Sequence, residues 1–138
     1  MSGFDRPEFF VGQQETFWKV ITEGESALFA GLTGENTPDV ISNNGNENDL
    51  THQCVVSPLM VVGIIGGLLN SRIPGKGSQC VTIQYEFLAP IYCGDRIETT
   101  IELIDFDPHK RLVTLKTNSF NQAKTQVLTG QAVMLISA

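Results

Sequence analysis

The residues best suited to proton transfer lie in a polar stretch between positions 33 and 52. This stretch, TGENTPDVISNNGNENDLTH, contains several acidic and hydroxyl side chains, among them the carboxylates of Glu35 and Asp39 and the hydroxyl of Thr37, and it ends with the imidazole of His52. Carboxylates and imidazoles commonly act as general acids and bases. The candidate catalytic residues are Glu35 and His52, and the candidate substrate-binding residues are Thr37 and Asp39; their choice among the polar residues of this stretch depends on the resemblance described below. The alternative for each is structural, because residues in Asn-, Asp- and Gly-rich stretches make turns in long solvated loops.

Three further polar residues have simpler explanations than chemistry. Ser57 precedes Pro58, and this pair is typical of a helix N-cap and first turn, so a nucleophilic role would also need a nearby base. Lys76 lies in the turn IPGKGS, which lacks the longer glycine-rich pattern that cradles phosphates. His109 lies in the turn DPHK, where we expect it to be exposed. Only Ser57 is kept as a candidate, at the start of a helix.

The cysteines argue against a disulfide framework and against a zinc site. There are three, Cys54, Cys80 and Cys93, an odd number without CxxC spacing. We expect small buried or half-buried thiols. No positively charged residue stands beside Cys54 to stabilise a thiolate, so a structural role is favoured over a nucleophilic one. The sequence predicts no metal and no cofactor.

A long apolar helix is expected over positions 58–73, directly after the polar stretch. The segment SPLMVVGIIGGLLNSRI is apolar nearly all round, so the helix must be covered on most sides. It is shorter than the roughly 20 residues that a membrane span needs. Gly63, Gly66 and Gly67 each cost about 1 kcal/mol relative to Ala inside a helix, which indicates that another backbone or a ligand comes close.

The remaining helix and strands are predicted from the periodicity of apolar residues and from a helix-capping signal. A strand is expected over 15–21 and a helix over 23–32, with Thr22 and Glu25 at capping-box spacing. After position 80 the apolar residues alternate with polar ones, which indicates half-buried strands. No helical pattern separates these strands, so the sheet should be antiparallel. They are expected over 81–87, 97–103, 111–120 and 125–136. A sheet that wraps around the apolar helix would bury it, which gives an α+β hot-dog fold.

Composition limits the kind of protein and its partners. The 138 residues are 41% hydrophobic and 17% charged, which is enough for one core and suggests a single domain over 1–138. The net charge of −6 and the lack of a basic stripe argue against nucleic acid as a partner. No signal or transit peptide is visible, and no segment is long enough for a membrane. We therefore expect a cytoplasmic protein.

Three segments together resemble the MaoC-like (R)-specific enoyl-CoA hydratases. FFVGQQETF is similar to the family's opening strand, and FAGLTGENTPDV is similar to its hydratase motif. The run LLNSRIPGKGSQCVTIQYEFLAPIYCGDRIETTIEL resembles the family pattern of helix, PGKGS-type turn, strand and "GD" step. The resemblance covers nearly the whole chain and implies the hot-dog fold.

The resemblance also implies which positions carry the chemistry, and some of them are altered. The family motif S-x-D-x-N-P-x-H, aligned on the proline, places Glu35 at the family Asp, Thr37 at the Asn and Val40 at the His, and valine cannot move a proton. The family's His-Gly-Met step, whose glycine amide polarises the thioester carbonyl, falls on Ser57, Pro58 and Leu59. Proline has no N–H. The first amides of a helix remain free, so Leu59 or Met60 is the substitute donor.

The implied function is acyl-thioester chemistry, with Ser57 and Leu59 added to the candidate substrate-binding residues. The family activity is hydration or dehydration of an acyl-CoA or acyl-carrier thioester, and the altered positions leave it modified or lost. Two alternatives stay open: a hot-dog acyl-CoA thioesterase, which would use Glu35 and a water, and a non-catalytic acyl-binding subunit. The family also implies a homodimer joined through sheet edges.

Overall fold

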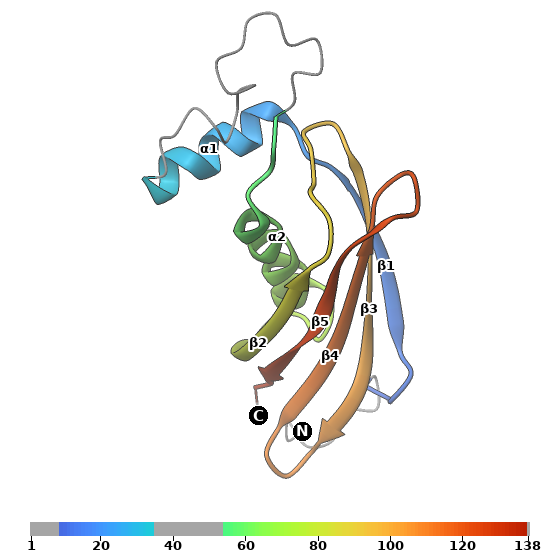
Figure 1. The fold of residues 1–138 in the computed structure, drawn as a ribbon. Coiled ribbons are helices and arrows are strands. Elements are labelled where there is room, and N and C mark those ends of the chain that lie inside the picture. Colours follow the sequence, from blue (N-terminus) through green and yellow to red (C-terminus); the bar gives the residue numbers. More distant parts are fainter. Residues whose placement is uncertain (1–8, 35–53, 138) are drawn as a thin grey trace, which may run out of the picture.

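The computed structural model describes residues 9–34 and 54–137, which form a curved antiparallel sheet with a helix on one face (Figure 1). In chain order the elements are β1 (Gln14–Val20), α1 (Glu23–Thr33), α2 (Pro58–Ser71), β2 (Gln79–Phe87), β3 (Arg96–Asp107), β4 (Leu112–Phe120) and β5 (Gln126–Leu135). The order across the sheet is β1-β3-β4-β5-β2, and every neighbouring pair is antiparallel. The predicted α+β hot-dog fold is confirmed. In the described part of the chain, no helix is long and apolar enough to cross a membrane.

The short helix α1 begins where the capping signal predicts. The Thr22 hydroxyl accepts the Glu25 amide at 3.2 Å, and the Glu25 carboxylate accepts the Thr22 amide at 3.0 Å. Both halves of the capping box are therefore formed. Gly34 ends the helix in the left-handed conformation that glycine adopts without steric cost.

The core lies between one face of α2 and the facing side of the sheet. Met60, Val61, Ile65 and Leu69 recur at helical spacing, and all four are buried. The sheet supplies alternate residues from its inner face, because successive side chains of a strand point to opposite sides. These buried strand residues include Ile97, Ile101, Leu103, Val113, Leu115, Val127, Ala132 and Met134.

Among the described residues, none covers the opposite face of α2, which corrects the expectation that the helix is buried on most sides. Leu59 is 65% exposed, and Gly63 and Gly67 are exposed as well. A Cβ atom built on any of the three helical glycines, Gly66 included, would meet nothing within 4 Å. No other backbone of the described chain approaches them, so a neighbouring backbone does not explain these glycines there, and the alternative of a close ligand stays a prediction.

Strand β2 also differs from the half-buried strand that its alternating pattern predicts. It lies at one edge of the sheet and pairs only with β5. Val81, Ile83 and Phe87 are 53%, 38% and 44% exposed. Only Tyr85 is partly buried, and its hydroxyl lies 3.4 Å from the Thr117 hydroxyl. Alternation shows which residues share a face of the strand, and nothing within ranges 9–34 and 54–137 covers that face of β2.

The pairing of β2 with β5 depends on Gly130, which lies opposite Tyr85 in the register. A Cβ atom at Gly130 would collide with the carbonyl oxygen of Gln84 and would lie 2.7 Å from the Cα of Tyr85. Glycine therefore allows the two backbones to approach at this point.

Two of the three cysteines form a disulfide, which corrects the expectation of free thiols. Cys54 and Cys93, separated by 39 positions, are bonded with a Cα–Cα distance of 5.2 Å. The third, Cys80, is a free and exposed thiol on β2. The odd count left one cysteine over without excluding a pair between the other two.

Candidate active site at the start of helix α2

Most of the predicted site residues lie outside the described residues. Glu35, Thr37, Asp39 and His52, together with Val40, fall in the segment 35–53. They remain predictions. The two candidates that the structure does place are Ser57 and Leu59, both at the beginning of α2.

Ser57 is the N-cap residue of α2, as the Ser-Pro pair predicts. Its backbone is extended, with φ −62° and ψ 128°, and Pro58 follows in the first turn. However, its side chain makes no capping hydrogen bond, so capping by the hydroxyl does not explain this serine. The half-buried side chain keeps its hydroxyl available for another partner.

Two backbone amides in the first turn of α2, those of Leu59 and Met60, differ in whether they donate a hydrogen bond within the described chain. The Met60 amide donates to the Ser57 carbonyl at 3.0 Å, which removes Met60 as a donor for a ligand. Pro58 has no amide hydrogen. Within the described ranges, no acceptor is found for the Leu59 amide. Of the two substitute donors suggested by the sequence, Leu59 is therefore the one that the geometry supports.

The electrostatics at this point favour a partial negative charge. The aligned peptide dipoles place the positive end of α2 at its N-terminus. The first turn contains no acidic residue that would neutralise it. A carbonyl oxygen that gains negative charge during a reaction is stabilised at such a helix end.

A short backbone pairing holds the start of α2 against the β2–β3 connection. The Val56 amide donates to the Ile91 carbonyl, and the Cys93 amide donates to the Cys54 carbonyl, each at 2.8 Å. These bonds flank an isolated antiparallel bridge between Val55 and Tyr92. The disulfide between Cys54 and Cys93 joins the same two segments. The sequence contains no signal for this pairing, because the segments meet only in the fold.

Asp95 fixes the other side of this connection. Its carboxylate accepts the Tyr92 amide at 2.9 Å and the Gln122 side-chain amide at 2.9 Å. Its carbonyl accepts the Ile21 amide at 3.3 Å, and Gly94 donates to the Ile21 carbonyl at 2.7 Å. The "GD" step of the sequence therefore ties the β2–β3 connection to the end of β1 and to the β4–β5 turn.

A small apolar cavity lies beside α2, between the helix and strands β1 and β3. Its volume is about 80 Å³, and residues such as Phe17, Ile64 and Leu68 form its walls. Drug-sized ligands occupy pockets of about 300–1,000 Å³, so this cavity has room only for a short apolar chain. Sequence reasoning missed it, although Phe17 belongs to the alternating inner residues of β1.

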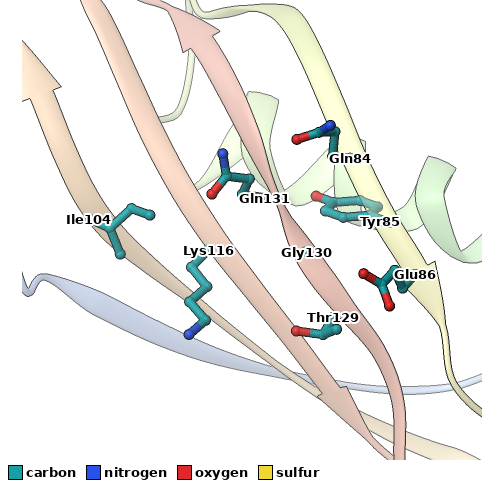
Figure 2. A pocket seen from close by; sticks show the side chains of 8 residues that line it. All are labelled: Gln84, Tyr85, Glu86, Ile104, Lys116, Thr129, Gly130 and Gln131. Atoms are coloured by element: carbon teal, nitrogen blue, oxygen red, sulfur yellow. The ribbon is translucent and has the colours of Figure 1, made fainter.

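A larger hollow of about 650 Å³ lies on the outer face of the sheet, away from α2 (Figure 2). Lys116 and Gln131 point to that face, because their neighbours Leu115 and Ala132 are buried on the inner one. Figure 2 shows exposed polar side chains along β2, β4 and β5, including Glu86. The described residues that line this hollow include no ion pair, no histidine and no cysteine. We therefore do not place the active site there.

The described residues hold no cluster suited to a metal ion. No group of three or more His, Cys, Asp and Glu side chains gathers among them. Burial raises the pKa of the Tyr85 phenol, although its hydrogen bond with Thr117 acts in the opposite direction. Tyr85 is therefore neutral near pH 7 and serves as a packing residue with a polar tip.

Comparison with curated proteins finds relatives that are named as hydratases or dehydratases of acyl-CoA thioesters. The chain is 28% identical over 127 residues to an (R)-specific enoyl-CoA hydratase of Rhodospirillum rubrum, covering 92% of this chain and 88% of the relative. It is 28% identical over 105 residues to a 3-hydroxybutyryl-CoA dehydratase of Methylorubrum extorquens, covering 76% and 67%. No protein-family model matches the chain.

The solved structures agree with these relatives. An (R)-hydratase from A. caviae involved in PHA biosynthesis superposes with a TM-score of 0.85 at 26% identity, over 95% of this chain and 99% of that one. A MaoC-like dehydratase from Rhodospirillum rubrum shares the fold, with a TM-score of 0.71 at 17% identity, over 95% of each chain. The chain therefore has the hot-dog fold, and in sequence and fold it is similar to (R)-specific enoyl-CoA hydratases.

Proposed function

We propose that the chain is an enzyme that adds water to, or removes it from, an acyl-CoA thioester. The observation that carries this proposal is the unused Leu59 amide at the positive end of α2. Relatives named as an enoyl-CoA hydratase and a 3-hydroxybutyryl-CoA dehydratase give the substrate class. A thioester of an acyl carrier is the alternative form of the same substrate.

The proposed reaction uses the helix start as the oxyanion site. The thioester carbonyl accepts the Leu59 amide, while Glu35 removes a proton from a water whose oxygen adds to C3 of a trans-2-enoyl chain. The electron pair of the double bond moves to the thioester, which becomes an enolate held by the amide. A proton then reaches C2, and the product is the 3-hydroxyacyl thioester.

We assign supporting roles to the other candidates. His52 is the proposed partner of Glu35 in moving the proton, in place of the histidine that Val40 replaces. Thr37, Asp39 and the unused Ser57 hydroxyl are proposed to bind the substrate. The apolar cavity beside α2 is the proposed position of a short acyl chain, because Ile64 and Leu68 of its wall lie on the same helix as the oxyanion site.

Hydrolysis of the thioester is the second candidate function. The observation in its favour is the pair of altered positions, Val40 and Pro58, because hydrolysis needs one carboxylate and a positioned water. If both activities are lost, a non-catalytic acyl-binding subunit is the remaining function. We also propose that the protein acts in the cytoplasm, in fatty acid metabolism.

One assay separates these functions. The protein is incubated with crotonyl-CoA and with butyryl-CoA while enoyl absorbance and free thiol are followed. Loss of enoyl absorbance without thiol release supports hydration, thiol release from both substrates supports hydrolysis, and neither supports the binding subunit. Glu35→Gln should abolish the observed activity. Glu23→Gln, which changes an exposed carboxylate on α1, is the matched control and should leave the activity unchanged.

We further propose a homodimer joined through the free edge of β2. Ile83 and Phe87 continue the apolar inner side of the sheet at this edge, yet both are exposed in one chain. The uncovered face of α2, with Leu59 and Gly63, is exposed as well. A second copy pairing along β2 would satisfy the strand edge and cover these apolar surfaces.

Light scattering of two variants tests the dimer. Ile83→Glu places a charge at the proposed interface and should give a monomer at micromolar concentration. Ile104→Glu, at an exposed residue on the outer face of β3, should remain dimeric. A monomeric unmodified protein would contradict the proposal.

A further inference from the structure

The disulfide between Cys54 and Cys93 lies three residues before the N-cap of α2. Residues 54–56 pair with residues 91–93 through two backbone hydrogen bonds. Within the described chain, these are the backbone hydrogen bonds that join the two segments. The disulfide is a covalent link between the same two segments. It therefore contributes directly to where the chain enters the helix and to where the Leu59 amide lies.

The two partners of the disulfide differ in how firmly they are held. On the Cys93 side, the Asp95 carboxylate binds the Tyr92 amide and the Gln122 side chain, and Gly94 donates to Ile21. This side is attached to β1 and to the β4–β5 turn. On the Cys54 side, the backbone hydrogen bonds that the described chain offers are only those of the short pairing with residues 91–93, and Val56 packs into the core. Breaking the disulfide should therefore loosen the start of α2 rather than the β2–β3 connection.

We propose that Cys54 and Cys93 form a redox modification site that positions the Leu59 amide, with glutathione as the exchanging thiol. The disulfide form holds the start of α2 for catalysis, and the dithiol form releases it. The effect on catalysis rests on the proposed function, whereas the effect on the helix start does not. Disulfides inside the cell are usually redox-sensing or catalytic, which suits this placement if the protein is cytoplasmic.

The exchange proceeds in two balanced steps. A glutathione thiolate attacks the sulfur of Cys93, which is half-buried, whereas Cys54 is only 5% exposed. The Cys54–Cys93 bond breaks, and Cys54 leaves as a thiolate that takes up a proton. A second glutathione thiolate attacks the mixed disulfide, releasing the Cys93 thiolate and glutathione disulfide. The protein gains two electrons and two protons, and oxidation by glutathione disulfide is the reverse.

The chain contains its own control for this chemistry. Cys80 is an exposed free thiol on β2, away from the start of α2. Glutathionylation of Cys80 is the alternative explanation for any response of the protein to redox buffers. Cys80→Ser removes that explanation and leaves the proposed pair intact.

The test uses the full-length Cys80→Ser protein in buffers of graded glutathione to glutathione disulfide ratio. Free thiols, amide hydrogen exchange over residues 54–60 and crotonyl-CoA hydration are measured at each ratio. We expect reduction to add two thiols, to speed exchange in that segment, and to lower kcat toward the roughly 10²- to 10³-fold loss caused by removing an oxyanion donor. All three changes should reverse on oxidation.

Two single variants complete the test. Cys54→Ser and Cys93→Ser should each show the fast exchange and low kcat of the reduced protein at every glutathione ratio. Hydrogen exchange that does not respond to the redox state would overturn the proposal, as would a kcat that stays constant while the thiols appear. If no variant hydrates or hydrolyses any thioester, the proposed function fails, and hydrogen exchange alone decides the redox site.

Discussion

Replacing Leu59 by proline should remove the proposed oxyanion donor while leaving α2 in place. The Leu59 amide has no acceptor in the described chain, and the first turn is closed by the Met60 amide donating to Ser57. Proline is tolerated in the first turn because the amides there have no partner within the helix. The leucine side chain is 65% exposed in one chain, so its loss removes little packing there, and Leu59→Ala controls for any packing against a second copy. The change therefore acts mainly on one N–H group.

The expected magnitude follows from the role of that group. Removal of one oxyanion-hole donor costs about 2.7–4 kcal/mol of transition-state stabilisation, which is a loss of roughly 10²- to 10³-fold in kcat. Leu59→Ala keeps the amide and should retain kcat within a few fold. Both variants are assayed for crotonyl-CoA hydration, with circular dichroism and Tm as checks of the fold.

One steric effect is controlled by a second variant. A proline at position 59 disfavours the helical conformation of Pro58 before it. Replacement of the Leu59 amide by an ester removes the same N–H without a second ring. If either variant folds as the parent does and hydrates crotonyl-CoA at the parental rate, Leu59 does not bind the thioester oxygen and the proposed site is wrong.

Three further predictions concern stability and the altered motif. Gly130→Ala should lower the Tm by about 4–12 °C in a thermal melt, because overpacking against a backbone costs about 1–3 kcal/mol; an unchanged Tm would mean that β2 and β5 are not so close. The Lys19 ammonium, 2.6 Å away, and the Thr22 amide hold the pKa of Glu25 below its usual value of 4.5. This contribution to stability is present above the unfolded pKa and is lost as pH falls through the folded one, so Glu25→Gln should lower the Tm at pH 7 by more than at pH 3. Val40→His combined with Pro58→Gly should raise crotonyl-CoA hydration, and no gain would show that these positions do not limit the rate.

Much of the fold could be predicted because its signals are local. Thr22 with Glu25, and Ser57 with Pro58, mark the helix starts through caps that involve neighbouring residues. The period of two after position 80 marks the strands, and their antiparallel order follows from the absence of helices between them. Strand and helix bounds consequently differ from the predicted ones by only a few residues.

The errors arose where the answer depends on distant parts of the molecule. Periodicity assigns Ile83 to an apolar face, but only the position of β2 at the sheet edge leaves that face exposed. In the same way, the apolar composition of α2 does not reveal that Gly63 faces open space. Cys54 and Cys93 pair because two segments 39 positions apart meet in the fold, and spacing alone does not predict this.

The candidate site was predictable only in part, for the same reason. The sequence gives two substitute donors at the helix start, since both Leu59 and Met60 follow the proline. The choice between them depends on the hydrogen bond from Met60 to Ser57, which only the structure shows. Glu35 and His52 lie outside the described residues and remain predictions.

The central claim is that the thioester carbonyl of the substrate binds at the start of α2. Its most direct test is the infrared difference spectrum of bound crotonyl-CoA, with and without isotopic labelling of the thioester carbonyl carbon. The claim predicts that the carbonyl stretch moves to lower frequency on binding, because the Leu59 amide polarises the bond, and that the Leu59 ester variant loses this shift. A stretch that matches free substrate in the unmodified protein, or an equal shift in both proteins, would contradict the claim.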